Sequence, residues 1–136
     1  MAAHSNNFPW MSYYGNYKFF EQRMQEHSKV SSCEQLDAGL YRVRLTSGKI
    51  LKVFICECYS FGTAEYIESC EKYGDLDVVV ISSNWCGYTL ELKRDCMVAK
   101  VGVFDVRGFM VALNKKEYWA YLSSYEVDRF EEYGWL

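Results

Sequence analysis

Apolar residues recur at helical spacing near the start of the chain. They are Tyr17, Phe20, Met24 and His27. This spacing predicts an amphipathic helix over residues 16 to 28, with Asn16 as its cap and the apolar stripe in the core. A strand is expected near residues 29 to 36.

Residues 39 to 59 change to a period of two, with apolar and polar side chains alternating along two short runs. The link Thr46-Ser47-Gly48 predicts a β-hairpin, because its glycine can take a positive φ without steric cost. Extended outward, the register that keeps the apolar residues on one face sets Asp37 opposite Glu57. Its inner pairs are Leu45 with Lys49, Val43 with Leu51, and Tyr41 with Val53.

The second half of the chain alternates helices with short strands. The β-branched run from Val78 to Ile81 is typical of a central strand buried on both faces. The capping box Ser123-x-x-Glu126 predicts the start of the second of two small helices within residues 114 to 136. The remaining predicted elements are helices over 63–74, 88–100 and 106–113 and a strand over 101–104.

This order predicts an α/β fold with a mixed sheet, because a hairpin pairs antiparallel and helical crossovers impose parallel neighbours. The 136 residues contain no linker, repeat or low-complexity tract, so we expect a single domain over residues 1–136. Half of the residues are hydrophobic, which excludes a disordered chain.

Charge and hydropathy narrow the function classes. The net charge of -3 argues against coating nucleic acid by bulk positive charge, so any such contact has to be local. No apolar run is long enough to cross a bilayer, and residues 1–10 do not resemble a signal sequence. We therefore expect a cytoplasmic protein without a membrane partner.

Cysteine and histidine chemistry is poorly supported. The six cysteines include no C-x-x-C pair, and both histidines lie far upstream of most of them, which does not favour zinc. We expect reduced, buried thiols that act as small hydrophobic groups. Hydrolase triads and glycine-rich nucleotide loops are not indicated either.

One acidic constellation is informative. Asp37 is followed, after nineteen residues, by Glu57-Cys58-Tyr59. With the order of elements, this layout resembles the PD-(D/E)XK restriction-endonuclease-like superfamily, and within it the Mrr-like branch, over about residues 16–113. Residues 114–136 would then form a helical C-terminal extension.

The resemblance implies a three-layer α-β-α fold and a nuclease of defence, including phage defence, or of DNA processing. It implies that Asp37 and Glu57 bind Mg²⁺ and position the attacking water, with Glu21 or Glu26 as an outer carboxylate. Tyr59 occupies the position of the family's catalytic lysine, and a tyrosine uncharged near neutral pH cannot activate water as well. Lys18 or Lys93 would have to replace that lysine, so both an active nuclease and a catalytically degenerate one stay open.

A rival register satisfies the same motif. Asp77 is followed, after thirteen residues, by Glu91-Leu92-Lys93. The alternation around Glu91 fits a strand, but few residues remain before Val101 for the helix that the motif requires. Otherwise Glu91 and Lys93 are solvated helix residues, and Asp77 marks the turn into the buried strand.

Basic residues decorate the predicted hairpin. They are Arg42, Arg44, Lys49 and Lys52, with no acid between Gly39 and Cys56. Their positive charge is typical of side chains that bind nucleic-acid phosphates, and it is equally typical of an exposed strand that is protected against aggregation.

Two non-enzymatic alternatives remain. The first is a non-catalytic assembly module on the same fold, binding a protein partner or forming a homodimer through exposed aromatics. The aromatic candidates are Tyr13, Tyr14, Trp119, Tyr121, Tyr125 and Trp135. The second is a small-molecule sensor at the turn of residues 82–88, because open α/β sheets bind ligands beyond the carboxyl ends of their strands.

Overall fold

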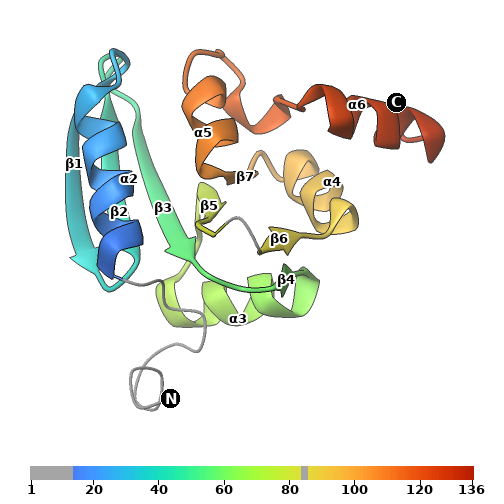
Figure 1. Ribbon diagram of the computed structural model, residues 1–136, viewed down its shortest axis with the longest axis horizontal. Helices are drawn as coiled ribbons and strands as arrows, with labels where there is room; N and C mark the ends of the chain where they lie inside the picture. The colour runs from blue at the N-terminus through green and yellow to red at the C-terminus, as the bar shows by residue number, and fades with distance from the viewer. Residues whose placement is uncertain (1–13, 84–85) are drawn as a thin grey trace.

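A mixed sheet of five strands organises the residues described by the computed structural model, which are 14–83 and 86–136. Its order is β1-β2-β3-β5-β7 (Figure 1). The strands β1 (Val30–Asp37), β2 (Leu40–Leu45) and β3 (Ile50–Cys56) pair antiparallel. In parallel pairing, β3 is followed by β5 (Val78–Ile81), and β5 is followed by β7 (Gly102–Asp105). The predicted α/β class with a mixed sheet is confirmed.

Helices cover both faces of this sheet and give three layers. One face packs against α2 (Tyr14–Glu26), α5 (Val106–Ala112) and the 3₁₀ turn η1 (Tyr118–Ala120). The other packs against α3 (Thr63–Tyr73) and α4 (Leu90–Val98). We call these the α2 face and the α3 face. The C-terminal helix α6 (Ser124–Glu132) lies above α4 in the view of Figure 1.

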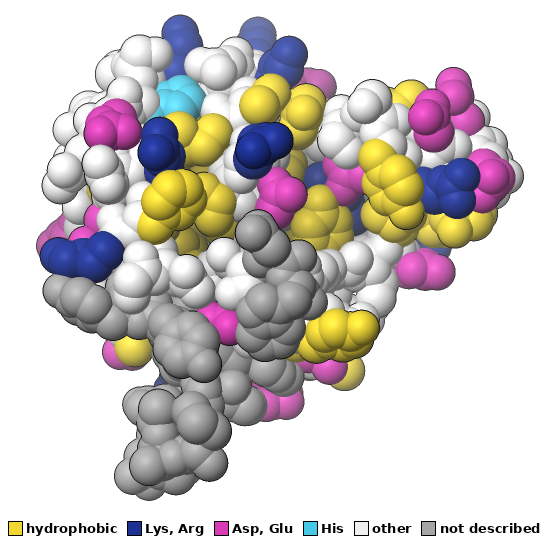
Figure 2. Space-filling model, in the orientation of Figure 1, with side chains coloured by type: hydrophobic (Ala, Val, Ile, Leu, Met, Phe, Trp, Pro, Cys, Tyr) yellow, Lys and Arg dark blue, Asp and Glu magenta, His cyan; other side chains and the backbone are white. Residues whose placement is uncertain are grey.

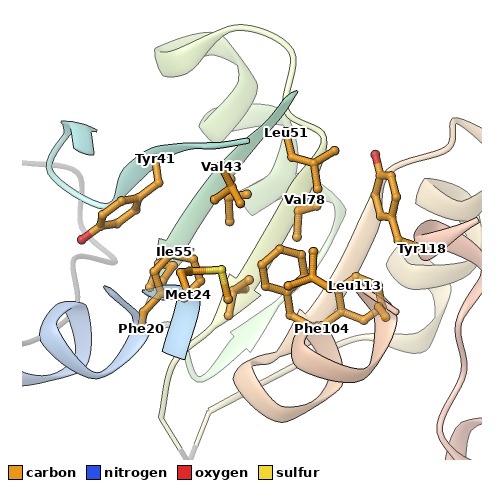
Figure 3. Packing of buried hydrophobic residues seen from close by; sticks show 14 residues of the cluster. Phe20, Met24, Tyr41, Val43, Leu51, Ile55, Val78, Phe104, Leu113 and Tyr118 are labelled. Carbon is orange, nitrogen blue, oxygen red and sulfur yellow. The ribbon is translucent and has the colours of Figure 1, made fainter. Parts of the chain in front are cut away.

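The hydrophobic core is divided by the sheet, as the period of two requires. Val78 and Val80 point to the α2 face, whereas Val79 and Ile81 point to the α3 face. All four are buried, which confirms the predicted central strand. Figure 3 shows the packing on the α2 face, where Phe20 of α2 meets the sheet.

The hairpin has the predicted inner register. Val43 pairs with Leu51 and Tyr41 pairs with Val53, and the amide of Leu45 donates to the carbonyl of Lys49 at 2.8 Å. The loop glycine, Gly48, has a φ of 94°. These observations confirm the hairpin and the reason for its glycine.

The outward extension of that register is wrong. The chain turns at Gly39, which has a φ of 78°, and its carbonyl accepts a hydrogen bond from the amide of Ile55 at 2.7 Å. Asp37 therefore ends the preceding strand and pairs with Leu40, not with Glu57. β1 also carries register shifts between Val30 and Ser32 and between Gln35 and Asp37.

The later helices match the predictions in kind and differ at their bounds. The helix expected from residue 88 starts at Leu90, because β6 (Gly87–Tyr88) pairs with β4 (Ser60–Phe61) and Thr89 caps the helix. The capping box of Ser123 and Glu126 is present at the start of α6. Among the described residues, no helix combines the length and the apolar character that crossing a membrane requires.

Candidate functional site

The three parallel strands end level with one another. Cys56 pairs with Ile81, and Ile81 pairs with Asp105. The residues that follow these positions therefore meet at one edge of the sheet, which we call the carboxyl edge. Open α/β sheets bind their ligands at this edge.

Glu57 lies at the carboxyl edge, directly after β3. Its Oε1 accepts a hydrogen bond from Asn16 Nδ2 at 3.2 Å, and the same nitrogen lies 3.4 Å from Ser83 Oγ. Asn16 belongs to the first turn of α2, so its predicted role as a cap is replaced by a tie between α2 and the ends of β3 and β5. Glu57 is thereby directed to the α2 face.

Asp37 lies elsewhere. It is exposed, its Oδ1 accepts from the amide of Ala38 at 2.7 Å, and it shares the side of its partner Leu40, which is the α3 face. Burial, and secondarily the charge of Asp37, raise the pKa of Tyr73 on α3 to about 12. Asp37 and Glu57 therefore point to opposite faces of the sheet.

This geometry does not fit a metal ion shared by the two predicted ligands. β1 and β3 are separated by β2, so their backbones lie roughly 10 Å apart at two strand spacings. Mg²⁺ requires each oxygen at about 2.1 Å in octahedral geometry. Within residues 14–83 and 86–136, no group of three or more His, Cys, Asp or Glu side chains is placed to hold a metal.

The other members of the predicted catalytic set do not converge on Glu57 either. Tyr59 is 77% exposed. The Glu21 carboxylate accepts a hydrogen bond from the Tyr41 hydroxyl at 2.6 Å and pairs with Lys18 at 3.8 Å. Glu26 forms an ion pair with Arg23 at 3.5 Å.

The rival register is not assembled as a strand. Glu91 and Lys93 lie on α4, and Asp77 lies at the opposite end of the sheet, just before β5. The Asp77 carboxylate accepts from the amide of Lys52 at 2.8 Å and so joins β3 to β5. The strand interpretation fails after Tyr88, because Thr89 caps a helix that contains residues 90–93, with its hydroxyl accepting from the Leu92 amide.

The four basic residues of the hairpin do not share one surface. Arg42 and Arg44 lie exposed on the α3 side of β2, and Arg42 pairs with Glu34 at 2.8 Å. Lys52 reaches the carbonyl of Tyr73 on the same side. Lys49 instead lies on the α2 side, with its ammonium over the rings of Tyr118 and Trp119.

A pocket of about 730 Å³ opens at the carboxyl edge, between α2 and α5. Two arginines, Arg23 and Arg107, flank it, and Ser82 and Ser83 provide hydroxyls. Its one described acid is Asp105, whose Oδ1 accepts from the Gly108 amide at 2.6 Å and caps α5. Figure 2 shows basic side chains beside hydrophobic ones over this part of the surface.

The thiols near the pocket are not activated. Cys86 lines it, and burial, followed by the charge of Glu57, raises the pKa of that thiol. Burial likewise raises the pKa of Cys56 and of Cys58. Because the thiolate is the nucleophile, a raised pKa makes these cysteines weak nucleophiles near neutral pH. All six cysteines of the chain are free.

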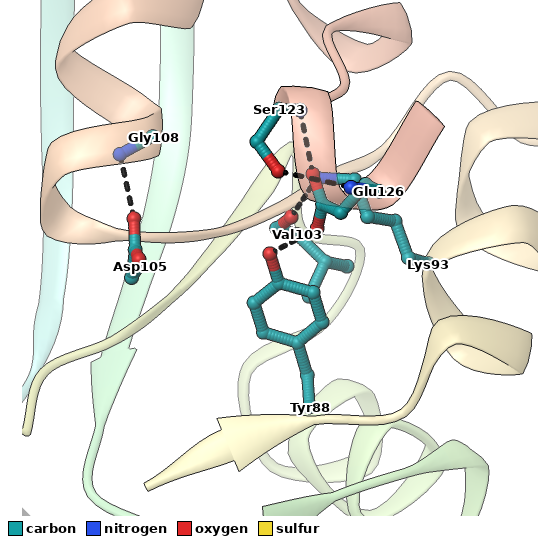
Figure 4. A network of polar contacts seen from close by, with 7 residues as sticks. All are labelled: Tyr88, Lys93, Val103, Asp105, Gly108, Ser123 and Glu126. Atoms are coloured by element: carbon teal, nitrogen blue, oxygen red, sulfur yellow. Dashed lines mark hydrogen bonds and ion pairs between the residues drawn. The ribbon is translucent and has the colours of Figure 1, made fainter. Parts of the chain in front are cut away.

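A buried polar network joins α4 to α6, and none of the sequence interpretations of Lys93 predicts it. Lys93 is 1% exposed, lies 3.4 Å from Glu126 and donates to the Val103 carbonyl at 2.7 Å (Figure 4). The Tyr88 hydroxyl donates to the same carboxylate. Burial lowers the pKa of Lys93, which Glu126 partly offsets. The sequence signal was the capping box, which explains only half of the contacts of Glu126.

The aromatic residues considered for a protein interface differ in their exposure. Tyr125 is 66% exposed, whereas Trp119, Tyr121 and Trp135 are half-buried. Tyr13 lies outside the described residues, as do Asn84 and Trp85 of the predicted ligand turn.

The chain matches no protein-family model, no curated protein and no solved structure.

Proposed function

We propose that this chain is a restriction-endonuclease-like protein that binds the phosphodiester backbone of nucleic acid at its carboxyl edge without metal-dependent cleavage. The observation that carries the proposal is the pocket flanked by Arg23 and Arg107, with Ser82 and Ser83 in its wall. A guanidinium matches the oxygens of a phosphate with two parallel hydrogen bonds, and serine hydroxyls are common phosphate donors.

The order of elements supports the fold family. A helix, a three-stranded antiparallel meander, a helix, a strand, a helix and a further parallel strand follow one another from α2 to β7. Glu57 directly follows the meander and contacts Asn16, which also contacts Ser83 of the pocket wall. The family's motif position and the pocket are thus neighbours.

The same residues argue against catalysis. The Asp37 carboxylate lies on the α3 face, whereas Glu57 accepts its hydrogen bond from the α2 side. Tyr59 replaces the lysine and is largely exposed. Lys93, one of the two replacement lysines considered, is held in a buried pair with Glu126. The pocket keeps its cationic side chains while the metal pair is dispersed.

The test combines binding with cleavage. Fluorescein-labelled duplex and single-stranded oligonucleotides are titrated with the wild type, with Arg23→Gln/Arg107→Gln and with the charge-matched control Arg42→Gln/Arg44→Gln. We expect the pocket variant to lose at least tenfold in affinity, because two phosphate contacts disappear, and the control to change little. Unchanged binding by the pocket variant would overturn this site.

Cleavage is measured on supercoiled DNA, linear DNA and single-stranded RNA with Mg²⁺ or Mn²⁺. We expect no cutting by the wild type. Metal-dependent cutting that disappears in Asp37→Asn and Glu57→Gln would contradict the non-catalytic proposal and restore the nuclease, whereas loss only in Asp77→Asn and Glu91→Gln would move the site to the rival register.

A second candidate is the protein-binding module. It is favoured by Tyr125 and Tyr133, which are 66% and 50% exposed on and just after α6. Self-association in sedimentation velocity that is lost in Tyr125→Ser/Tyr133→Ser, together with no oligonucleotide binding, would support this candidate instead.

A further inference from the structure

A second basic surface lies at the opposite end of the sheet from the carboxyl edge. It is a groove of about 580 Å³ between the tip of the β2–β3 hairpin and the segment that follows α5. Figure 2 shows lysine and arginine side chains along the upper edge of the molecule, where Figure 1 places these two loops. We call it the lysine groove; its residues are Lys29, Lys49, Lys115, Lys116, Tyr118 and Trp119, with Lys100 beside Trp119.

The lysine groove is positive although the whole chain carries a net charge of -3. Its five lysines are exposed, and none forms an ion pair with a carboxylate of the described residues. Glu117 is the only acid among the described lining residues. The charge is therefore available to an anionic ligand.

An indole ring lies among these lysines. Trp119 lines the groove, packs edge-on against Tyr118 at 5.2 Å between ring centroids and is half-buried. The ammonium groups of Lys49 and Lys100 lie 5.4 Å and 5.6 Å from its centroid. Tyr118 is buried, so it fixes the indole against the core.

We propose that the lysine groove binds single-stranded nucleic acid, with phosphates on the lysines and one base stacked on Trp119. Every base has a π-face, and single-strand binders combine a cationic groove with aromatic platforms. A bound phosphate draws the flexible Lys49 ammonium off the indole and leaves that face to the base. The ring and the charges thus serve neighbouring parts of one nucleotide.

The shape of the site favours this occupant over a membrane. The groove is concave and its aromatic ring is half-buried, whereas a bilayer surface is flat and binds apolar side chains that project from the protein. A basic patch without the ring would fit any polyanion. The inference does not rest on the proposed function, because the groove and the carboxyl-edge pocket share no residue.

The test is fluorescence anisotropy with a labelled twelve-residue oligothymidylate and the full chain. Lys115→Gln/Lys116→Gln is compared with Arg42→Gln/Arg44→Gln, which removes the same charge from the other side of the hairpin. We expect the groove variant to bind at least tenfold more weakly and the salt slope of log K to fall by about 1.4, for two phosphate contacts on a single strand. Trp119→Leu, with its fold checked by circular dichroism, is expected to lose about tenfold in affinity with the salt slope unchanged.

Three results would overturn the inference. They are equal losses in the groove variant and the charge-matched control, full affinity in both groove variants, and binding to phosphatidylserine vesicles without binding to the oligonucleotide. Loss only in Arg23→Gln/Arg107→Gln would support the carboxyl-edge site and reject the groove. Loss only in the groove variants would do the reverse, so the two proposals fail separately.

Discussion

Lys93 Nζ lies 3.4 Å from Glu126 Oε1, and the two side chains are only 1% and 7% exposed. The ammonium also lies 4.3 Å from the centroid of the Phe104 ring. A charge so deeply buried needs its partner, because neither water nor salt can replace it. This pair therefore fixes α6 against α4 and the central sheet.

Replacing only one member of this pair should be costly. Lys93→Met leaves the Glu126 carboxylate buried without its counterion, and we expect a loss of about 3 kcal/mol in the free energy of unfolding. Lys93→Met/Glu126→Gln removes both charges while the amide oxygen keeps the bond from the Ser123 amide. Urea denaturation should show that the double variant recovers at least half of the loss, and additive losses would contradict the pairing.

The turn between β1 and β2 should tolerate no side chain. Gly39→Ala must adopt a positive φ and would place its Cβ 2.7 Å from the Ile55 carbonyl oxygen. Gly48→Ala has the same conformational cost but meets no atom within 4 Å. We expect about 1 kcal/mol for Gly48→Ala and clearly more for Gly39→Ala in chemical denaturation. Equal losses would show that the backbone contact is unimportant.

The cap of α5 can be tested with two substitutions of Asp105, one that removes the acceptor and one that keeps it. Asp105→Ala deletes the acceptor for the Gly108 amide, and we expect a loss of about 1 kcal/mol in the free energy of unfolding. Asp105→Asn keeps an acceptor at the same place and should stay close to the wild type. A thermal unfolding series compares the three proteins. A large loss in Asp105→Asn would indicate that the charge, not the cap, matters.

Stability should fall at alkaline pH. Burial raises the pKa of Cys96 from 9.0 to about 12. As pH rises above 9, the unfolded chain releases this proton first, so the free energy of unfolding decreases towards pH 12. Cys96→Ala lacks the proton in both states and should show a shallower decrease between pH 8 and 11 in urea titrations. Parallel curves would contradict the assignment.

The local patterns were sufficient for most of the fold. The period of two and the loop glycine specify the hairpin register, because a slip of one residue would expose Val43 and Leu51. The run from Val78 to Ile81 specifies the centre of the sheet, because only a central strand buries apolar side chains on both faces. Such features depend on neighbours in sequence or on burial alone.

The candidate site is harder to predict from the sequence than the fold, because its position depends on where the strands end. The hairpin register extends past Leu40 only if the strand is straight, whereas Gly39 turns the chain and moves Asp37 into β1. The pocket joins Arg23 of α2 to Arg107 of α5, and no spacing in the sequence connects them. Likewise, the burial of Lys93 results from the docking of α6.

The two register shifts in β1 have a consequence for behaviour at high concentration. This strand forms one border of the sheet, and its outer amides and carbonyls offer a template to another chain. The shifts leave only Ser32 to Gln35 in uninterrupted pairing with β2. Bulged edges bend and twist away from a flat partner. The border is therefore poorly suited to seed filament growth, even where the protein is crowded.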